Sequence, residues 1–220
     1  EGDLYFPGSP VLTVSGTLGE CVLLETLVLS VLNHDSAIAS AAARMTLAAG
    51  GTAEDGGRPL VEMGSRRTHE QAAVAVARAA HVAGFATTSN LAAGLAHGVP
   101  TVGTAAHAFT LAYRSEAQAF AAQVAAQGVG TTLLVDTYDT ADGIRTAVEV
   151  AGRGLGAIRI DSGDLAEESG KARALLDEPG ATETRIIVTS DLDEYVITAL
   201  GDAPIDGYGV GTRVATGSGH

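Results

Sequence analysis

Charged residues of the kind that bind ligands stand at the end of an apolar run in the second half of the sequence. Arg159 and Asp161 are two positions apart around Ile160, so on a strand their side chains would lie on one face of the sheet. If that face is a barrel interior, a charged pair there is costly unless its members pair or bind a ligand. The two residues are therefore either a buried ion pair or a ligand site, in which Arg159 holds a carboxylate and Asp161 binds sugar hydroxyls or magnesium.

Two further residues have side chains suited to acid–base or nucleophilic chemistry. His107 follows a Gly-Thr pair at an expected strand-to-helix turn, where a neutral ring nitrogen can act as a base or a nucleophile. Asp136 follows another apolar run and could bind magnesium or orient a histidine, whereas Asp139 is as well suited to capping a helix. A solitary histidine is more often structural, so these residues gain weight only in combination.

Possible anion-binding residues follow three other runs. Arg66 and Arg67 come directly after a β-type run, where guanidinium groups can bind phosphate or carboxylate, although paired arginines are also common in surface ion pairs. Two glycines near the end of the chain can present backbone N–H groups to a phosphate. The other candidate residues at strand ends are Ser89, Asn90, Gly211 and Thr212.

The elements that must position these residues alternate along the chain. Seven β-type runs separated by helical patterns predict a parallel sheet with crossover helices. Because each run ends in a polar cluster, we expect a closed or nearly closed barrel rather than an open doubly wound sheet with one switch point. The runs end near Met63, Thr88, Gly103, Val135, Ile160, Val188 and Val210, and helices are predicted at 69–83, 90–96, 112–127, 140–152, 165–177 and 192–200.

The N-terminal part has a different pattern. A β-type run at 11–14 precedes two predicted helices at 18–33 and 35–49, and the glycine-rich stretch 50–57 is typical of a loop. We therefore expect residues 1–50 to be a strand and helices that belong to, or bridge, an additional domain. Residues 58–220 are expected to form the α/β barrel.

Composition narrows the class of protein. A net charge of -13 over 220 residues argues against a nucleic-acid surface. Cys21 is the only cysteine, which excludes an internal disulfide and fits a cytoplasmic location. The apolar stretch 21–32 is interrupted by Glu25 and is shorter than the roughly 20 residues that a membrane span needs, so no membrane association is expected. Without an initial Met, the sequence is expected to be part of a longer one.

Taken in order, the motifs resemble those of nicotinate phosphoribosyltransferases, which belong to the type II phosphoribosyltransferases. The resemblance extends over almost the whole chain, and its specificity comes from the series rather than from any one motif. The motifs are Glu25-Thr26, Ala41-Ala42-Ala43-Arg44, Gly64-Ser65-Arg66-Arg67, Ser89-Asn90, Gly103-Thr104 with His107, Asp136-Thr137-Tyr138-Asp139 and Arg159-Ile160-Asp161-Ser162-Gly163-Asp164.

The resemblance implies a fold and an activity. The expected fold is an irregular, incomplete TIM-like barrel with part of an additional N-terminal α/β domain. The expected reaction joins nicotinate to phosphoribosyl pyrophosphate, giving nicotinate mononucleotide and pyrophosphate in the salvage route to NAD. ATP is the expected co-substrate, hydrolysed through a phosphohistidine, Mg²⁺ is the expected cofactor, and a homodimer is the expected assembly.

The resemblance also implies roles for individual residues. His107 matches the phosphorylated histidine, and Asp136 would orient its ring or bind magnesium. Arg159 matches the residue that contacts the pyridine substituent, and Asp161 matches the one that holds ribose hydroxyls, with magnesium as a second possible ligand. The remaining matches are Gly211 and Thr212 around the 5′-phosphate, Arg66 with Arg67 at phosphoribosyl pyrophosphate, and Ser89 with Asn90 near the base.

Three alternatives remain open. A nicotinamide enzyme shares the fold and the histidine, but Ser89 stands where that enzyme places an acid, which favours a carboxylate ligand here. A quinolinate enzyme needs no ATP, so phosphorylation of His107 would exclude it. The third alternative is a barrel fragment that binds nucleotide without catalysis.

Overall fold

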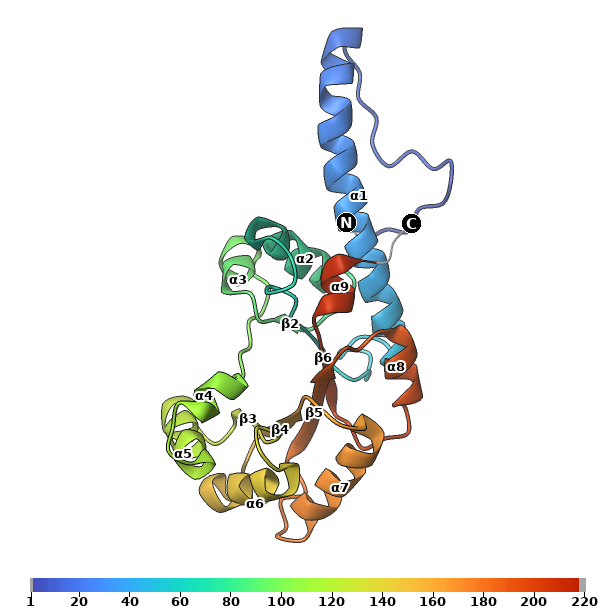
Figure 1. Cartoon of the computed structure of the whole chain (residues 1–220). Coiled ribbons are helices and arrows are strands. Elements are labelled where there is room, and N and C mark those ends of the chain that lie inside the picture. The colour runs from blue at the N-terminus through green and yellow to red at the C-terminus, as the bar shows by residue number, and fades with distance from the viewer. Residues whose placement is uncertain (1, 218–220) are drawn as a thin grey trace.

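The computed structural model describes residues 2–217 and confirms an α/β fold built on a parallel sheet. The strands lie in the order β2-β1-β6-β5-β4-β3, and every pairing is parallel. Because β6 returns to pair with β1, the sheet curls into a half-barrel (Figure 1). The strands are β1 (Leu60–Glu62), β2 (Thr87–Thr88), β3 (Thr132–Leu134), β4 (Ala157–Ile160), β5 (Arg185–Ser190) and β6 (Gly207–Val210).

Helices surround the curled sheet, and apolar residues of both layers form the core between them (Figure 1). Ile158, Ile160 and Val188 of the central strands are fully buried in this core. The helices are α1 (Leu18–Ala48), α2 (Glu70–Val82), α3 (Leu91–His97), α4 (His107–Leu111), α5 (Glu116–Gln127), α6 (Thr140–Ala151), α7 (Leu165–Asp177), α8 (Glu194–Ala199) and α9 (Thr212–Thr216).

Aspartate side chains begin three of these helices by accepting backbone N–H groups of the first turn. Asp139 caps α6, Asp164 caps α7 and Asp193 caps α8. The structure therefore decides the alternative left open for Asp139, which serves as a helix cap. Its side chain accepts a hydrogen bond from the Asp142 amide at 2.9 Å.

The prediction of two N-terminal helices and a preceding strand was wrong. One helix of 31 residues, α1, covers both predicted helices, because residues 20–48 contain no glycine or proline to interrupt its hydrogen bonds. Residues 11–14 form no strand. Their apolar side chains are exposed, and no neighbouring strand is present in the described chain to pair with them.

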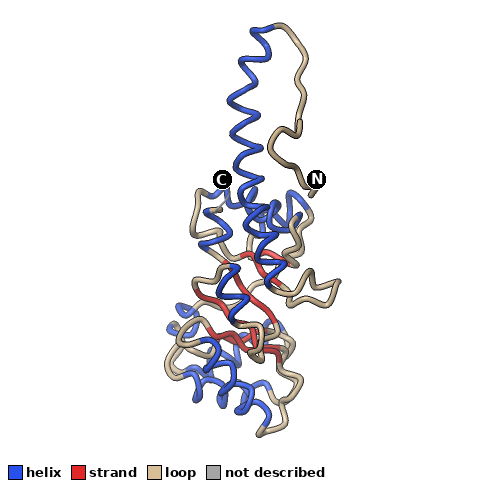
Figure 2. Tube along the Cα trace, turned by 90° about the vertical axis from the view of Figure 1, so that its right-hand side faces the viewer, coloured by secondary structure: helices blue, strands red, loops and turns tan. Residues whose placement is uncertain are grey.

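The C-terminal half of α1 packs against α2, α8 and α9, whereas its N-terminal half extends beyond the rest of the molecule (Figures 1 and 2). Ile38, Ala42 and Met45 are buried, while Leu18 and Leu23 are more than four-fifths exposed. By length and composition α1 qualifies as a candidate membrane span, a test that signal sequences and core helices also pass. The apolar stretch that appeared too short in the sequence is thus part of a longer helix.

Two further predictions were wrong around the open side of the sheet. The run ending near Gly103 forms an isolated bridge between Thr88 and Thr101 rather than a seventh strand. Pro100 precedes it and lacks an N–H donor, which limits pairing. The helix predicted at 112–127 begins only at Glu116, with Ser115 as the cap of α5, and a separate short helix, α4, precedes it. The sheet therefore stays open between Thr101 and β3, which makes the barrel incomplete.

Candidate active site

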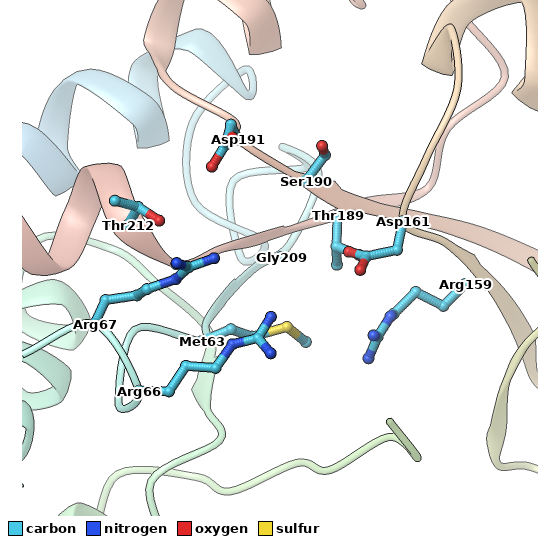
Figure 3. A pocket seen from close by; sticks show the side chains of 11 residues that line it. Met63, Arg66, Arg67, Arg159, Asp161, Thr189, Ser190, Asp191, Gly209 and Thr212 are labelled. Carbon is cyan, nitrogen blue, oxygen red and sulfur yellow. The ribbon is translucent and has the colours of Figure 1, made fainter. Parts of the chain in front are cut away.

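The carboxyl ends of β1, β4, β5 and β6 meet at a cavity of about 180 Å³ (Figure 3). Parallel strands place their ends on the same rim, so residues from distant parts of the sequence converge there. The cavity contains six of the ten predicted site residues, from three separate chain segments. Its lining consists of Met63, Arg66, Arg67, Arg159, Asp161, Thr189, Ser190, Asp191, Gly209, Gly211 and Thr212.

Three guanidinium groups surround this cavity. Arg66 and Arg67 are exposed on the loop after β1, which is turned by a 2.8 Å hydrogen bond from the Arg67 amide to the Gly64 carbonyl. Arg66 and Arg159 point toward one another from opposite sides of the cavity (Figure 3). Because like charges facing one another repel, this arrangement favours an anion between them.

Arg159 is held without the ion pair that was one of its two possible roles. Its Nη1 donates to the Thr104 hydroxyl, and its Nε is buried with no hydrogen-bond partner in the described structure. Burial lowers the pKa of Arg159, the carboxylates of Asp161 and Asp136 raise it, and Arg66 lowers it further. The guanidinium therefore keeps donor capacity that a ligand can use.

Asp161 faces both the cavity and the histidine. One of its oxygens, Oδ1, accepts a hydrogen bond from the Thr189 hydroxyl, and the other, Oδ2, lies 3.6 Å from Nε2 of His107. The side chain of Asp161 is one-quarter exposed. A partly exposed carboxylate fixed by one hydroxyl retains lone pairs that can accept hydrogen bonds from a ligand.

His107 is the first residue of α4 and lies between two carboxylates. Its Nδ1 lies 3.2 Å from the Thr137 hydroxyl, which orients the ring. Its Nε2 faces Asp136 Oδ1 at 4.0 Å and Asp161 Oδ2 at 3.6 Å. With 40% of the side chain exposed, the ring is accessible to a reactant while both acids face the same nitrogen.

Asp136, which follows β3, is hydrogen-bonded to the loop that follows β4, beneath His107. Its side chain is 1% exposed, and Oδ2 accepts hydrogen bonds from the Asp161 amide at 2.8 Å and the Ser162 hydroxyl at 2.6 Å. Oδ1 is buried without a hydrogen-bond partner. Asp136 therefore holds the loop after β4 with one oxygen and leaves the other directed toward His107.

A second acid lies near Asp136. Glu116 begins α5, and its Oε1 is also buried without a hydrogen-bond partner. Burial raises the pKa of Glu116, and the negative charges of Asp136 and Asp139 raise it further. Glu116 was not among the residues predicted for the site, because its position after Ser115 is also typical of an ordinary first helical turn.

Ser89 and Asn90 do not line the cavity. Ser89 is exposed at the end of β2. Asn90 caps α3 by accepting from the Ala93 amide at 2.9 Å, and its Nδ2 donates to the Ser65 hydroxyl at 3.0 Å. Asn90 thus supports the loop that carries Arg66 rather than facing the cavity itself.

Other lining residues were not selected from the sequence. Ser190 has a φ of 140°, the one positive value for a residue other than glycine in the described chain. Such backbone strain is concentrated at functional sites. Ser190 ends β5 and Asp191 follows it, and this polar pair was the available signal. Met63 and Thr189 gave none, because they continue the runs of β1 and β5.

The comparisons with known proteins agree on one group of enzymes, although no family model matches the chain. The nicotinate phosphoribosyltransferase pncB1 of Mycobacterium tuberculosis (strain H37Rv) is 63% identical over 227 residues, covering 100% of this chain and 49% of that protein. The nicotinate phosphoribosyltransferase of Bacillus subtilis (strain 168) is 43% identical over 225 residues, covering 98% and 44%. The chain thus spans about half the length of the curated relatives it matches.

Solved structures agree with these relatives. Human nicotinic acid phosphoribosyltransferase superimposes with a TM-score of 0.80 at 26% identity, over 96% of this chain and 54% of the human chain. The nicotinate-nucleotide pyrophosphorylase of Pyrococcus furiosus superimposes with a TM-score of 0.76 at 28% identity, over 84% and 48%. With its curled parallel sheet and rim of polar strand ends, the chain belongs to the nicotinate phosphoribosyltransferase family.

Proposed function

We propose that the protein forms nicotinate mononucleotide and pyrophosphate from nicotinate and phosphoribosyl pyrophosphate, with ATP hydrolysis coupled through a phosphohistidine at His107. This reaction lies in the salvage route to NAD. The observation that carries the proposal is the cavity where Arg66, Arg159 and Asp161 meet beside the histidine. Arginines suit the anionic groups of both substrates, and the carboxylate suits ribose hydroxyls.

Binding follows from the charges around the cavity. Arg159 holds the carboxylate of nicotinate with the guanidinium N–H groups that its bond to Thr104 leaves available. Arg66 and Arg67 contact phosphoribosyl pyrophosphate, while backbone N–H groups near Gly211 and Thr212, at the start of α9, face its 5′-phosphate. Asp161 accepts hydrogen bonds from the ribose hydroxyls.

The chemistry then depends on positioning. The pyridine nitrogen attacks the anomeric carbon of the sugar as pyrophosphate leaves, through a transition state with oxocarbenium character. Holding nicotinate and phosphoribosyl pyrophosphate in line supplies much of the rate enhancement, since both reactants must be oriented at the same time. The negative charge of Asp161 is near the sugar and stabilises the developing positive charge.

His107 has the surroundings of a phosphoryl acceptor. The Thr137 hydroxyl beside Nδ1 fixes the ring, and Nε2 faces the two carboxylates of Asp136 and Asp161. A carboxylate beside Nε2 can hold the proton that this nitrogen carries, which makes the ring more nucleophilic. We assign Asp136 as the residue that orients the ring.

The donor set fits one magnesium ion, with Asp136 and Asp161 as ligands. No group of three histidine, cysteine or acidic side chains in residues 2–217 is close enough to form a complete metal site. Mg²⁺, however, is usually held by one or two carboxylates together with water and substrate phosphates. The unpartnered Oδ1 of Asp136 is the observation that supports this fit. When bound, the ion would neutralise charge on the leaving pyrophosphate.

A homodimer and a cytoplasmic location belong to the same proposal. The exposed apolar side chains on the N-terminal half of α1, among them Leu23 and Leu27, favour burial against another surface. The single cysteine is free, as is usual for proteins of a reducing compartment.

One experiment separates this function from its alternatives. Purified protein is incubated with phosphoribosyl pyrophosphate and Mg²⁺, with and without ATP, and with nicotinate, nicotinamide or quinolinate as the base. We expect product from nicotinate, stimulated by ATP. Preference for nicotinamide, or ATP-independent turnover of quinolinate, would identify one of the related enzymes, and phosphate binding without any product would identify a binding fragment.

A further inference from the structure

A buried carboxylate beneath the rim has no part in the reaction described above. Glu62 is the last residue of β1 and is 1% exposed. Both of its oxygens accept short hydrogen bonds of 2.5 Å, Oε1 from the Gly64 amide and Oε2 from the Thr88 hydroxyl. Burying a carboxylate without a cationic partner is costly, and in residues 2–217 no ion pair of Glu62 is present.

The two donors belong to the loops that follow β1 and β2. Gly64 begins the loop that carries Arg66 and Arg67, and Thr88 ends β2 immediately before Ser89 and Asn90. The carboxylate therefore joins one loop that faces the cavity to a second loop beside it.

A closed ring of hydrogen bonds connects these loops. The Thr88 hydroxyl donates to Glu62 and accepts from the Asn90 amide at 3.0 Å. The Asn90 side chain then donates to the Ser65 hydroxyl at 3.0 Å, next to Arg66. Each hydroxyl and carboxylate in the ring has a partner, so removing one acceptor leaves a buried donor unpaired.

The loop after β1, which begins at Gly64, is also packed closely against the segment around α9. A Cβ atom at Gly64 would lie 2.5 Å from Ala215 Cβ and 3.0 Å from the Gly211 carbonyl oxygen. Gly64 is thus in close contact with Gly211 and with Ala215 of α9, next to the end of β6 that pairs with β1. The Glu62 carboxylate holds Gly64 in this position, which sets the distance between the arginine loop and the Gly211 loop.

We propose that Glu62 is a positioning residue for the phosphoribosyl pyrophosphate site. It touches no substrate and acts through the Gly64 amide and the Thr88 hydroxyl to place Arg66 and Arg67 opposite Gly211. This inference rests on the proposed function. A displacement of about 1 Å in such a loop can lower the rate about 100-fold, so the effect of losing the contact is measurable.

The test compares Glu62→Gln with changes at its partner. Glu62→Gln keeps the size of the side chain but replaces an acceptor by an N–H₂ group. Thr88→Val removes the hydroxyl, and Thr88→Ser retains it. Glu70→Gln is the matched control, because Glu70 is an exposed acid on the neighbouring helix α2 and its replacement changes the net charge equally. KM for phosphoribosyl pyrophosphate, KM for nicotinate, kcat and the thermal midpoint are measured for each protein.

The expected result is selective. Glu62→Gln and Thr88→Val should each raise KM for phosphoribosyl pyrophosphate about tenfold or more, with little change in KM for nicotinate. Thr88→Ser and Glu70→Gln should behave like the wild type. The double variant should be no worse than the more severe single change, because both act through one contact.

Other results overturn the inference. Glu62→Gln with unchanged kinetics, or with equal increases in both KM values, would show that Glu62 has a purely structural role. If Glu62→Gln does not fold, the Thr88→Val and Thr88→Ser pair decides by the same criteria. A wild-type protein that forms no nucleotide and binds no phosphoribosyl pyrophosphate overturns the proposed function and this inference with it.

Discussion

Replacing Arg159 by glutamine removes the one guanidinium that faces the cavity from β4 while keeping most of the side-chain length. The wild-type side chain donates to Thr104 within the protein and retains an unpartnered Nε. Loss of a hydrogen bond to a charged group costs about 1.5–3 kcal/mol. At 1.4 kcal/mol for each factor of ten, KM for nicotinate should rise about 10- to 100-fold. Arg159→Lys should be intermediate, since it keeps the charge but loses the planar fork.

The assay is initial-rate formation of nicotinate mononucleotide at saturating phosphoribosyl pyrophosphate and ATP, with nicotinate varied. Nicotinamide serves as an internal comparison, because it lacks the negative charge that Arg159 is proposed to recognise. Glutamine at this position should therefore lower the preference for nicotinate over nicotinamide. A wild-type KM for nicotinate in Arg159→Gln, or an equal loss with both bases, would refute this assignment of the pyridine carboxylate.

Three other changes test separate parts of the structure. His107→Ala should abolish ATP hydrolysis and lower nucleotide formation at limiting phosphoribosyl pyrophosphate, measured by phosphate release; normal ATP turnover would remove His107 from the mechanism. Arg58→Met should lower the free energy of unfolding by about 2 kcal/mol in urea denaturation, because Arg58 donates to the Leu200, Gly201 and Ala203 carbonyls and the Tyr208 hydroxyl; an unchanged value would contradict this. Burial raises the pKa of Glu62 above its ordinary value of 4.5, so the folded state binds this proton more tightly than the unfolded state. The stability of the wild type relative to Glu62→Gln should therefore be greatest below pH 4.5 and fall as the pH rises through the folded-state pKa; a difference that grows with pH would contradict the sign.

Local patterns were sufficient to predict the order of most elements and the places where polar residues follow strands. Short continuous apolar runs identified the strands that end near Val135, Ile160, Val188 and Val210, since a strand in a parallel sheet is buried on both faces. The glycine-rich stretch 50–57 was predicted as a loop and is one. Each of these features depends on neighbouring residues only, which is why composition and spacing reveal it.

The errors arose where the decision depended on distant partners. The run at 11–14 has the composition of a strand, but a strand needs a neighbour, and none lies beside it in the described chain. The run before Gly103 reaches one partner, Thr88, and forms a bridge. The two expected N-terminal helices are one because the polar residues around Asn33 and His34 do not interrupt backbone hydrogen bonding.

By itself the sequence determined which residue types are available for chemistry and that they follow the ends of parallel strands. The tertiary structure decided which of them meet. It placed Asp136 and Asp161 at the same nitrogen of His107, and it placed Asn90 and Glu62 beneath the rim instead of in the cavity. The physical reason is strand pairing: β3 with β4 brings together the strand ends that precede Asp136 and Asp161, and β1 with β2 places Glu62 beside Thr88. The pairing of β6 with β1 brings residues more than 100 positions apart to the same cavity.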